Sequence, residues 1–198
     1  MTGRAPEPAS QLMAIFSLGG LHMTRARPRA VRCTPGFLAM DGSRRVVLDP
    51  FPEKGMTGVL EDGYARLSRG DHEVASQPWT GPSVGKRRWT DLDLLVFAGM
   101  TLWTWIGLPL ELHDQAGAVV ELDVPSDWPA TSRHHVLYRD EQGNVVRHEE
   151  GPLIHKLSAH CEFGGAVVAT RRRTRAVRGV TVLWADVVAA AMHGKPLN

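Results

Sequence analysis

Short runs in which hydrophobic and polar residues alternate fill residues 12–76 of the chain, and this period of two is typical of β-strands. Clusters of glycine, proline and aspartate separate the runs, as expected for turns. Asp62-Gly63 is the clearest hairpin signal, because both residues tolerate the positive φ angles of a two-residue turn. The spacing of the runs predicts an antiparallel meander. The predicted strands are Leu12–Leu18, a segment around Ala30–Arg32, Gly36–Met40, Arg45–Asp49, Gly58–Glu61, Tyr64–Ser68 and His72–Ser76.

The alternation resumes in the last third of the chain. Asp140–Gly143 has the composition of a tight turn and predicts a hairpin between the strands on either side of it. We interpret the basic segment Arg171–Arg175, followed by Gly179, as an exposed connection between the last two strands. The predicted strands here are Ala118–Val124, His135–Arg139, Asn144–Glu149, Gly165–Thr170 and Val180–Asp186.

Between these two regions lies the most apolar segment of the chain, Trp89–Pro109. Thr90 followed by Asp93 has the form of a capping box and predicts a helix start, while Gly107 and Pro109 predict its end. The resulting helix, residues 91–106, would be about 24 Å long, which is shorter than the ~30 Å of a bilayer core. We therefore predict an internal helix and no integral membrane insertion.

Apolar side chains surround this helix on every side, so it should be buried on more than one face. With a single helix and many strands, the economical arrangement is a mainly β (α+β) fold in which a curved antiparallel sheet, or half-barrel, wraps around one central apolar helix. We expect one domain over residues 11–198 after a flexible tail of residues 1–10. The helix either fills the core or lines an apolar cavity; the cavity-lining candidates are Phe97, Met100, Trp103 and Trp105.

Several segments resemble a group of uncharacterised actinobacterial proteins, and the likeness extends from about Leu12 to Trp184. The order of strands and helix is in turn similar to the lipoprotein-carrier type of fold. That resemblance implies an open antiparallel half-barrel that holds acyl chains against internal helices. The segments that carry the likeness are Phe16–Leu21, Val46–Pro52, Gly58–Gly63, Trp89–Leu95, Phe97–Gly99, Leu102–Trp103, Val146–His148, Phe163–Gly165 and Thr170–Arg173.

Composition narrows the functional classes. With 198 residues, 43% of them hydrophobic, the chain can form one real core, and a net charge of +2 gives no overall field that would favour nucleic acid. The two cysteines, Cys33 and Cys161, lie far apart, which argues against a disulfide framework or a thiolate zinc site. The first apolar run is too short for a signal peptide, so we expect a cytoplasmic location.

Histidine is the main source of candidate chemistry. The hairpin around residues 140–143 should place His135 and His148 on neighbouring strands, where they could move a proton near neutral pH. We select His148 and Tyr138 as candidate catalytic residues. No metal-site, nucleotide, dinucleotide or serine-hydrolase motif is present, so we predict neither a metal nor a cofactor.

The basic segment offers a second candidate contact. If it were a strand, alternation would turn either Arg172 or the pair Arg171 and Arg173 inward, and the other side chains would stay in water. An inward arginine suits a carboxylate or phosphate group. We therefore select Arg172 as a candidate ligand contact, the alternative being a solvated strand end.

These observations leave three hypotheses. In the first, the protein binds a hydrophobic small molecule in an internal cavity and acts as a cofactor-independent cyclase or isomerase of a polyketide-like substrate in bacterial secondary metabolism. In the second, it is a non-catalytic carrier or sensor of lipid-like, apolar molecules. In the third, it is a structural or partner-binding domain with a filled core.

Overall fold

The computed structural model describes residues 12–23, 28–40, 44–79, 89–112, 116–163, 166–176 and 181–192, so the tail predicted for residues 1–10 lies outside the described part of the chain. Within that part, twelve strands form one antiparallel sheet in the order β6-β5-β4-β3-β2-β1-β12-β11-β10-β9-β8-β7. The strands are β1 Leu12–Met23, β2 Pro28–Met40, β3 Val46–Asp49, β4 Met56–Glu61, β5 Tyr64–Arg69, β6 His72–Pro78, β7 Val119–Asp123, β8 His134–Arg139, β9 Val145–Glu150, β10 Leu153–Phe163, β11 Ala166–Ala176 and β12 Thr181–Met192.

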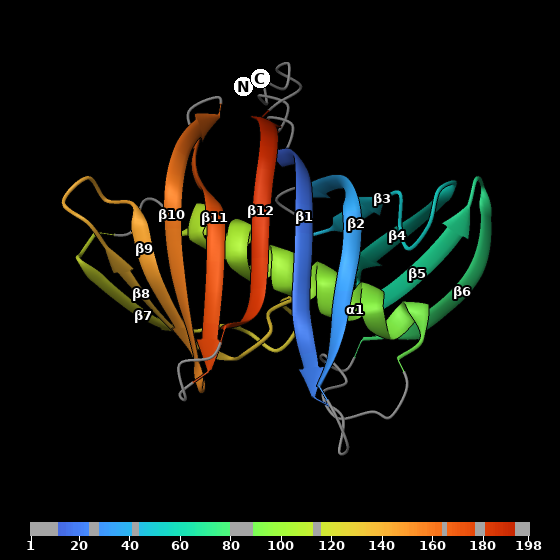
Figure 1. Cartoon of the computed structure of the whole chain (residues 1–198), viewed down its shortest axis with the longest axis horizontal. Coiled ribbons are helices and arrows are strands. Elements are labelled where there is room, and N and C mark those ends of the chain that lie inside the picture. The colour runs from blue at the N-terminus through green and yellow to red at the C-terminus, as the bar shows by residue number, and fades with distance from the viewer. Residues whose placement is uncertain are drawn as a thin grey trace, which may run out of the picture.

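The sheet is open, and its two flanks curve around the helix, which runs diagonally behind the central strands (Figure 1). Pairing of β1 with β12 joins the first and last strands at the centre of the sheet. The strands on either side of this pair follow one another as antiparallel neighbours out to β6 and β7. The predicted fold, a curved antiparallel half-barrel around one central apolar helix, is confirmed.

The helix begins where it was predicted to begin. In α1, Asp91–Leu102, the Asp93 backbone N–H donates to Thr90 Oγ1 at 3.1 Å, and the Thr90 N–H donates to Asp93 Oδ2 at 3.0 Å. These two bonds form the capping box and satisfy backbone donors that the first helical turn leaves free. No helix among the described residues is both long and apolar enough to cross a membrane.

The predicted helix end was wrong. The chain continues from α1 through one π-helical turn, η1 Trp103–Gly107, into the short helix α2 Leu108–Glu111. In the π-turn the Leu108 N–H donates to the carbonyl of Trp103, five residues back. Pro109 then lies in the first turn of α2, where its missing N–H and fixed φ angle are tolerated. Sequence rules for helix ends did not anticipate this rearrangement.

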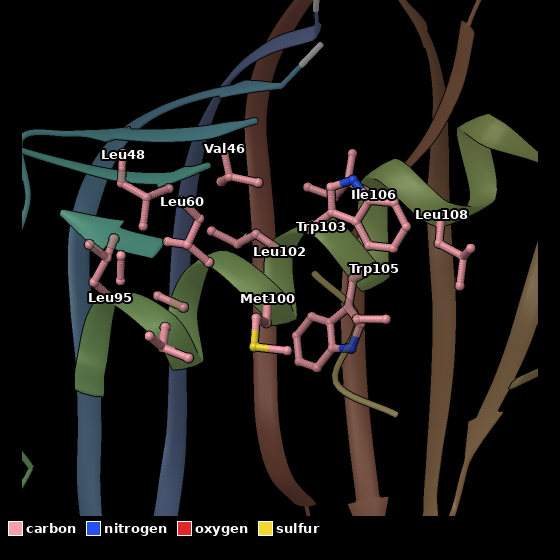
Figure 2. Close-up of a cluster of buried hydrophobic side chains, with 14 of the residues drawn as sticks. Val46, Leu48, Leu60, Leu95, Met100, Leu102, Trp103, Trp105, Ile106 and Leu108 are labelled. Atoms are coloured by element: carbon pink, nitrogen blue, oxygen red, sulfur yellow. The ribbon is translucent and has the colours of Figure 1, made fainter. Parts of the chain in front are cut away.

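Two glycines allow the helix and sheet to approach closely. A Cβ atom at Gly99 would lie 2.6 Å from a methyl carbon of Leu60, and one at Gly58 would lie 2.5 Å from a methyl carbon of Leu95. The contacts join α1 to β4 within one hydrophobic core, and Figure 2 shows Leu60 and Leu95 toward one end of the part of it that is drawn. The core reaches from β3 and β4 across the helix to β10 and β11.

Two strand predictions in the last third needed correction. Leu153–Phe163, which was not predicted as a strand, forms β10, and the segment interpreted as an exposed connection, Arg171–Arg175, belongs to β11. β11 pairs with β10 on one side and β12 on the other, so its backbone donors and acceptors are used by the sheet. Charged side chains concealed the strand pattern, because Arg172 is an inward-facing charge.

Candidate functional site: a buried cluster of histidine, glutamate and arginine

Strands β8 to β11 place five ionisable side chains on the inner face of the sheet, against the helix. These residues, which we call the polar cluster, are His135, His148, Glu150, His155 and Arg172, and all five are buried. Strand alternation and register bring them together, since His155 is opposite His148 across β9 and β10. Trp105 from η1 covers the cluster, with its ring centre 5.2 Å from that of His155.

One hydrogen-bond chain through the cluster has a fixed direction. Arg172 only donates, so its Nη2 donates to His148 Nδ1 at 3.0 Å, and His148 must then carry its proton on Nε2. That Nε2–H donates to His135 Nδ1 at 2.8 Å. His135 Nε2–H completes the chain by donating to the Ser132 carbonyl at 2.9 Å. Both histidines are thereby held as neutral rings, each in one tautomer.

A second hydrogen-bonded set centres on Glu150. His155 Nε2 lies 2.8 Å from Glu150 Oε1, and Thr131 Oγ1 donates to the other carboxylate oxygen. His155 Nδ1 is 2.7 Å from Thr174 Oγ1, which can donate to it. The Thr131 backbone N–H donates to Thr104 Oγ1 of η1 at 2.9 Å, so this set also joins the sheet to the π-turn.

Burial sets the charge states of the histidines. It lowers the pKa of His148 well below its usual value, and the nearby Arg172 charge lowers it further. Burial also lowers the pKa of His135, and it lowers that of His155 to about 4, although the Glu150 carboxylate opposes the second shift. Burial alone would raise the pKa of Glu150, but hydrogen bonds from His155 and Thr131 lower it. At neutral pH the histidines are therefore neutral and Glu150 is ionised.

Arg172 is the unusual member of the polar cluster. It is 3% exposed, and its Nε and Nη1 atoms have no hydrogen-bond partner among the described residues. Burial lowers its pKa to about 9, with Glu150 opposing the shift. The guanidinium carbon lies 4.8 Å from the centre of the Trp105 ring, and the buried Trp105 Nε1 likewise has no partner among the described residues. Hydrogen-bond donors that have no acceptor among the described residues therefore lie close together around Arg172 and Trp105.

His135, His148 and Glu150 each place a ligand atom within 4.8 Å of the others, so they are the described group best placed to hold a metal ion. The hydrogen bonds that these residues make in the structure disfavour metal binding. His148 Nε2 carries the proton it shares with His135 Nδ1, and Arg172 prevents the proton from moving to Nδ1. A cation would have to displace this proton while lying close to a guanidinium charge.

The structure brings some of the predicted site residues together and separates others. His135 and His148 are neighbours, as predicted, and Arg172 is the arginine that points inward. Tyr138 lies on β8 between inward-facing positions, and its ring lies 5.2 Å from the Arg147 guanidinium carbon. Tyr138 and His148 therefore face opposite sides of the sheet and do not form one site.

The helix residues predicted to line a cavity are placed differently from one another. Met100, Trp103 and Trp105 are buried, whereas Phe97 is only partly buried and packs edge-on against Trp89 with ring centres 5.1 Å apart. Trp103 packs edge-on against Trp128 at 5.6 Å. In Figure 2, Met100 and Trp105 project to one side of the helix and Trp103 to the other.

Sequence reasoning did not select Glu150, His155 or Thr131 as site residues, although Glu150 and His155 fall in the histidine-rich stretch 134–162. Alternation from His148 identifies Glu150 as a residue on the same face, so that signal was present. Identifying His155 required the strand β10, which was not predicted. Thr131 lies in the connection between β7 and β8, where no periodic pattern indicates its direction.

Comparison with known proteins gives a likeness only at the level of structure. No protein-family model matches the sequence, and no curated protein matches it. A LolA superfamily protein from Nitrosomonas europaea is similar over 98% of this chain and 90% of its own, with 11% identity and a TM-score of 0.49. A DUF1329 family protein from Desulfovibrio piger is similar over 96% of this chain and 88% of its own, with 10% identity and a TM-score of 0.46.

Proposed function

We propose that this protein binds a hydrophobic small molecule between the helix and the inner face of its sheet, and that it acts as a carrier or sensor without chemical turnover. The proposal rests on the mismatch between one helix and a very wide sheet. Twelve strands at about 4.8 Å spacing form a face roughly 50 Å across, measured along its curve. A helix is only 10–12 Å in diameter, and residues 91–111 span about 32 Å.

Protein side chains cover parts of this inner face. α1 packs against β3 to β6, α2 packs against β11, and Trp128 from the β7–β8 connection packs on Trp103. The helix nevertheless keeps partly exposed apolar side chains next to the core, at Leu92, Leu94 and Phe97. Apolar groups in this position favour a lipid-like molecule that completes the apolar layer.

We place the ligand along the side of the helix that carries Phe97, Met100 and Trp105. Phe97 is the accessible end of this surface, and Trp105 is its buried end beside the polar cluster. Trp103 faces away and packs on protein, so it supports the surface from behind.

The polar cluster favours binding over catalysis. A general acid or base needs a free proton or lone pair near the substrate. Both ring nitrogens of His148 are already hydrogen-bonded, and its lowered pKa keeps it neutral at pH 7. Tyr138 lies on the other face of the sheet. The two residues selected for the cyclase hypothesis, His148 and Tyr138, therefore do not share one surface.

Uptake of methyl palmitate, an uncharged lipid-like molecule, tests the proposal. We expect native mass spectrometry to show a saturable one-to-one complex and tryptophan emission to change as it forms. Phe97→Asp places a charge on the proposed surface and should weaken uptake. Val74→Asp, at an exposed residue of β6, is the matched control and should leave uptake unchanged. A wild-type protein that takes up no methyl palmitate would contradict the proposal.

A further inference from the structure

We propose that the bound molecule carries one anionic oxygen headgroup and that Arg172 and Trp105 bind it at the buried end of the ligand surface. This inference rests on the proposed function and names the chemical class of its ligand. The ligand would be an amphiphile, with an apolar chain along the helix and a carboxylate or phosphate group at the polar cluster.

The first support is a local excess of hydrogen-bond donors. Arginine has five N–H groups, and the three on Nε and Nη1 of Arg172 have no partner among the described residues. The Trp105 indole N–H is also buried and unpartnered within the same part of the chain. Since the ring centre of Trp105 is 4.8 Å from the guanidinium carbon, these donors belong to one small region. Buried donors are normally satisfied, so this region calls for acceptor atoms.

The second support is charge. The acidic member of the polar cluster, Glu150, is occupied by His155 and Thr131, and its hydrogen-bond partners among the described residues do not include Arg172. The guanidinium itself donates to a neutral ring, that of His148. The Glu150 carboxylate acts on Arg172 through space but makes no hydrogen bond to it. A buried cation is normally paired directly, and an anionic headgroup would supply a bonded counter-ion together with the missing acceptors.

The third support is the path that leads to this point. Leu94, Phe97, Thr101 and Trp105 are separated by three, four and four positions, so they follow one face of the helix. Leu94 and Phe97 are partly exposed, whereas Thr101 and Trp105 are buried. Thr101 Oγ1 is another buried polar atom without a partner among the described residues. The face therefore changes from apolar and accessible to buried and polar, as an amphiphile requires.

Equilibrium dialysis with radiolabelled palmitate, methyl palmitate and hexadecyl phosphate tests the inference. Palmitate and its methyl ester share the same chain and differ in charge, so their affinity ratio isolates the headgroup. We expect wild-type protein to bind palmitate about 10- to 100-fold more tightly than the ester. Whichever of palmitate and hexadecyl phosphate binds more tightly identifies the headgroup as carboxylate or phosphate.

Three variants assign the preference to its residues. Arg172→Met should abolish the preference for palmitate, because it should weaken palmitate binding far more than ester binding. Trp105→Phe keeps an aromatic ring and removes the N–H, and it should weaken palmitate binding about 3- to 10-fold. Arg173→Met is the matched control on the same strand, because Arg173 pairs with Asp186 in a half-exposed position; it should retain the full preference.

The outcomes separate this inference from the proposed function. Equal binding of palmitate and methyl palmitate by wild-type protein, or an unchanged preference in Arg172→Met, would overturn the headgroup assignment and leave apolar uptake intact. Binding of neither molecule would overturn both proposals. If Arg172→Met does not fold, Arg172→Lys keeps a charge but loses the planar set of donors, and a reduced preference in that variant supports the same assignment.

Discussion

Replacing Arg172 by methionine should stabilise the ligand-free protein at pH 7. Burial lowers the pKa of Arg172 from 12.5 to about 9, so the folded state holds this charge at a cost of about 5 kcal/mol relative to the unfolded chain. Methionine removes the charge and fills similar volume. It also leaves His148 Nδ1 without its donor, which costs about 1–3 kcal/mol. We expect a net gain of about 2–4 kcal/mol.

Urea unfolding followed by tryptophan fluorescence measures this difference at two pH values. The folded pKa of Arg172 lies below the unfolded one, so its contribution to wild-type stability increases as pH rises above about 9. The gain in the free energy of unfolding from Arg172→Met should therefore be about 2 kcal/mol smaller at pH 10.5 than at pH 7. Arg173→Met, which removes a half-exposed ion pair with Asp186, should change stability by less than about 1 kcal/mol.

A loss of about 3 kcal/mol or more in Arg172→Met at pH 7 would refute the reasoning. That loss is the result expected when one partner of a buried ion pair is removed and the other charge is left behind. It would mean that Arg172 and Glu150 form a structural pair, and that the unpartnered donors of Arg172 are not held ready for a ligand.

Three further predictions concern the polar cluster and the helix. The pKa of His155 is about 4 in the folded protein and 6.5 in the unfolded chain, so its contribution to the free energy of unfolding is complete above pH 6.5 and falls by about 3 kcal/mol between pH 6.5 and 4. Urea unfolding over this range should show a smaller decrease in the free energy of unfolding for His155→Gln than for the wild-type protein. Glu150→Gln should lower the free energy of unfolding by about 2–4 kcal/mol, whereas Glu149→Gln, at a less buried position, should lower it by less than about 1 kcal/mol. Equal effects of the two substitutions would argue against a stabilising role for the buried Glu150 carboxylate in the polar cluster. Gly99→Ala should destabilise by about 1–3 kcal/mol in thermal unfolding, despite the higher helix propensity of alanine, because its Cβ would meet Leu60; adding Leu60→Val should recover part of the loss.

Local patterns predicted the parts of this fold that depend on neighbours in sequence. Alternation gave most strands of the first meander, the hairpin that joins β8 and β9, and the proximity of His135 and His148. The capping box at Thr90 predicted the helix start, because a cap is formed within four residues.

The remaining features depend on contacts between distant parts of the chain. β10 and the arginine-rich half of β11 are strands because each is paired along its length, even though charged residues interrupt their hydrophobic pattern. Their pairing in turn decides that His155, Thr174 and Arg172 lie together at the polar cluster. No local signal specifies such pairing, so the sequence alone supported the candidate Arg172 without identifying its surroundings.

The π-turn and the buried arginine are both departures from local rules, and they meet at one place. A π-turn contains one residue more per turn than an α-helix, so it rotates the residues that follow it, by roughly 100° per added residue, and such turns are frequent at functional sites. The turn lies at Trp103–Gly107 and carries both Trp105, which covers Arg172, and Thr104, which receives a hydrogen bond from Thr131. Neither the rearranged helix nor the buried charge is favourable for folding when taken alone. Departures of this kind are expected where function constrains the sequence, and the headgroup that we propose at Trp105 and Arg172 would account for both.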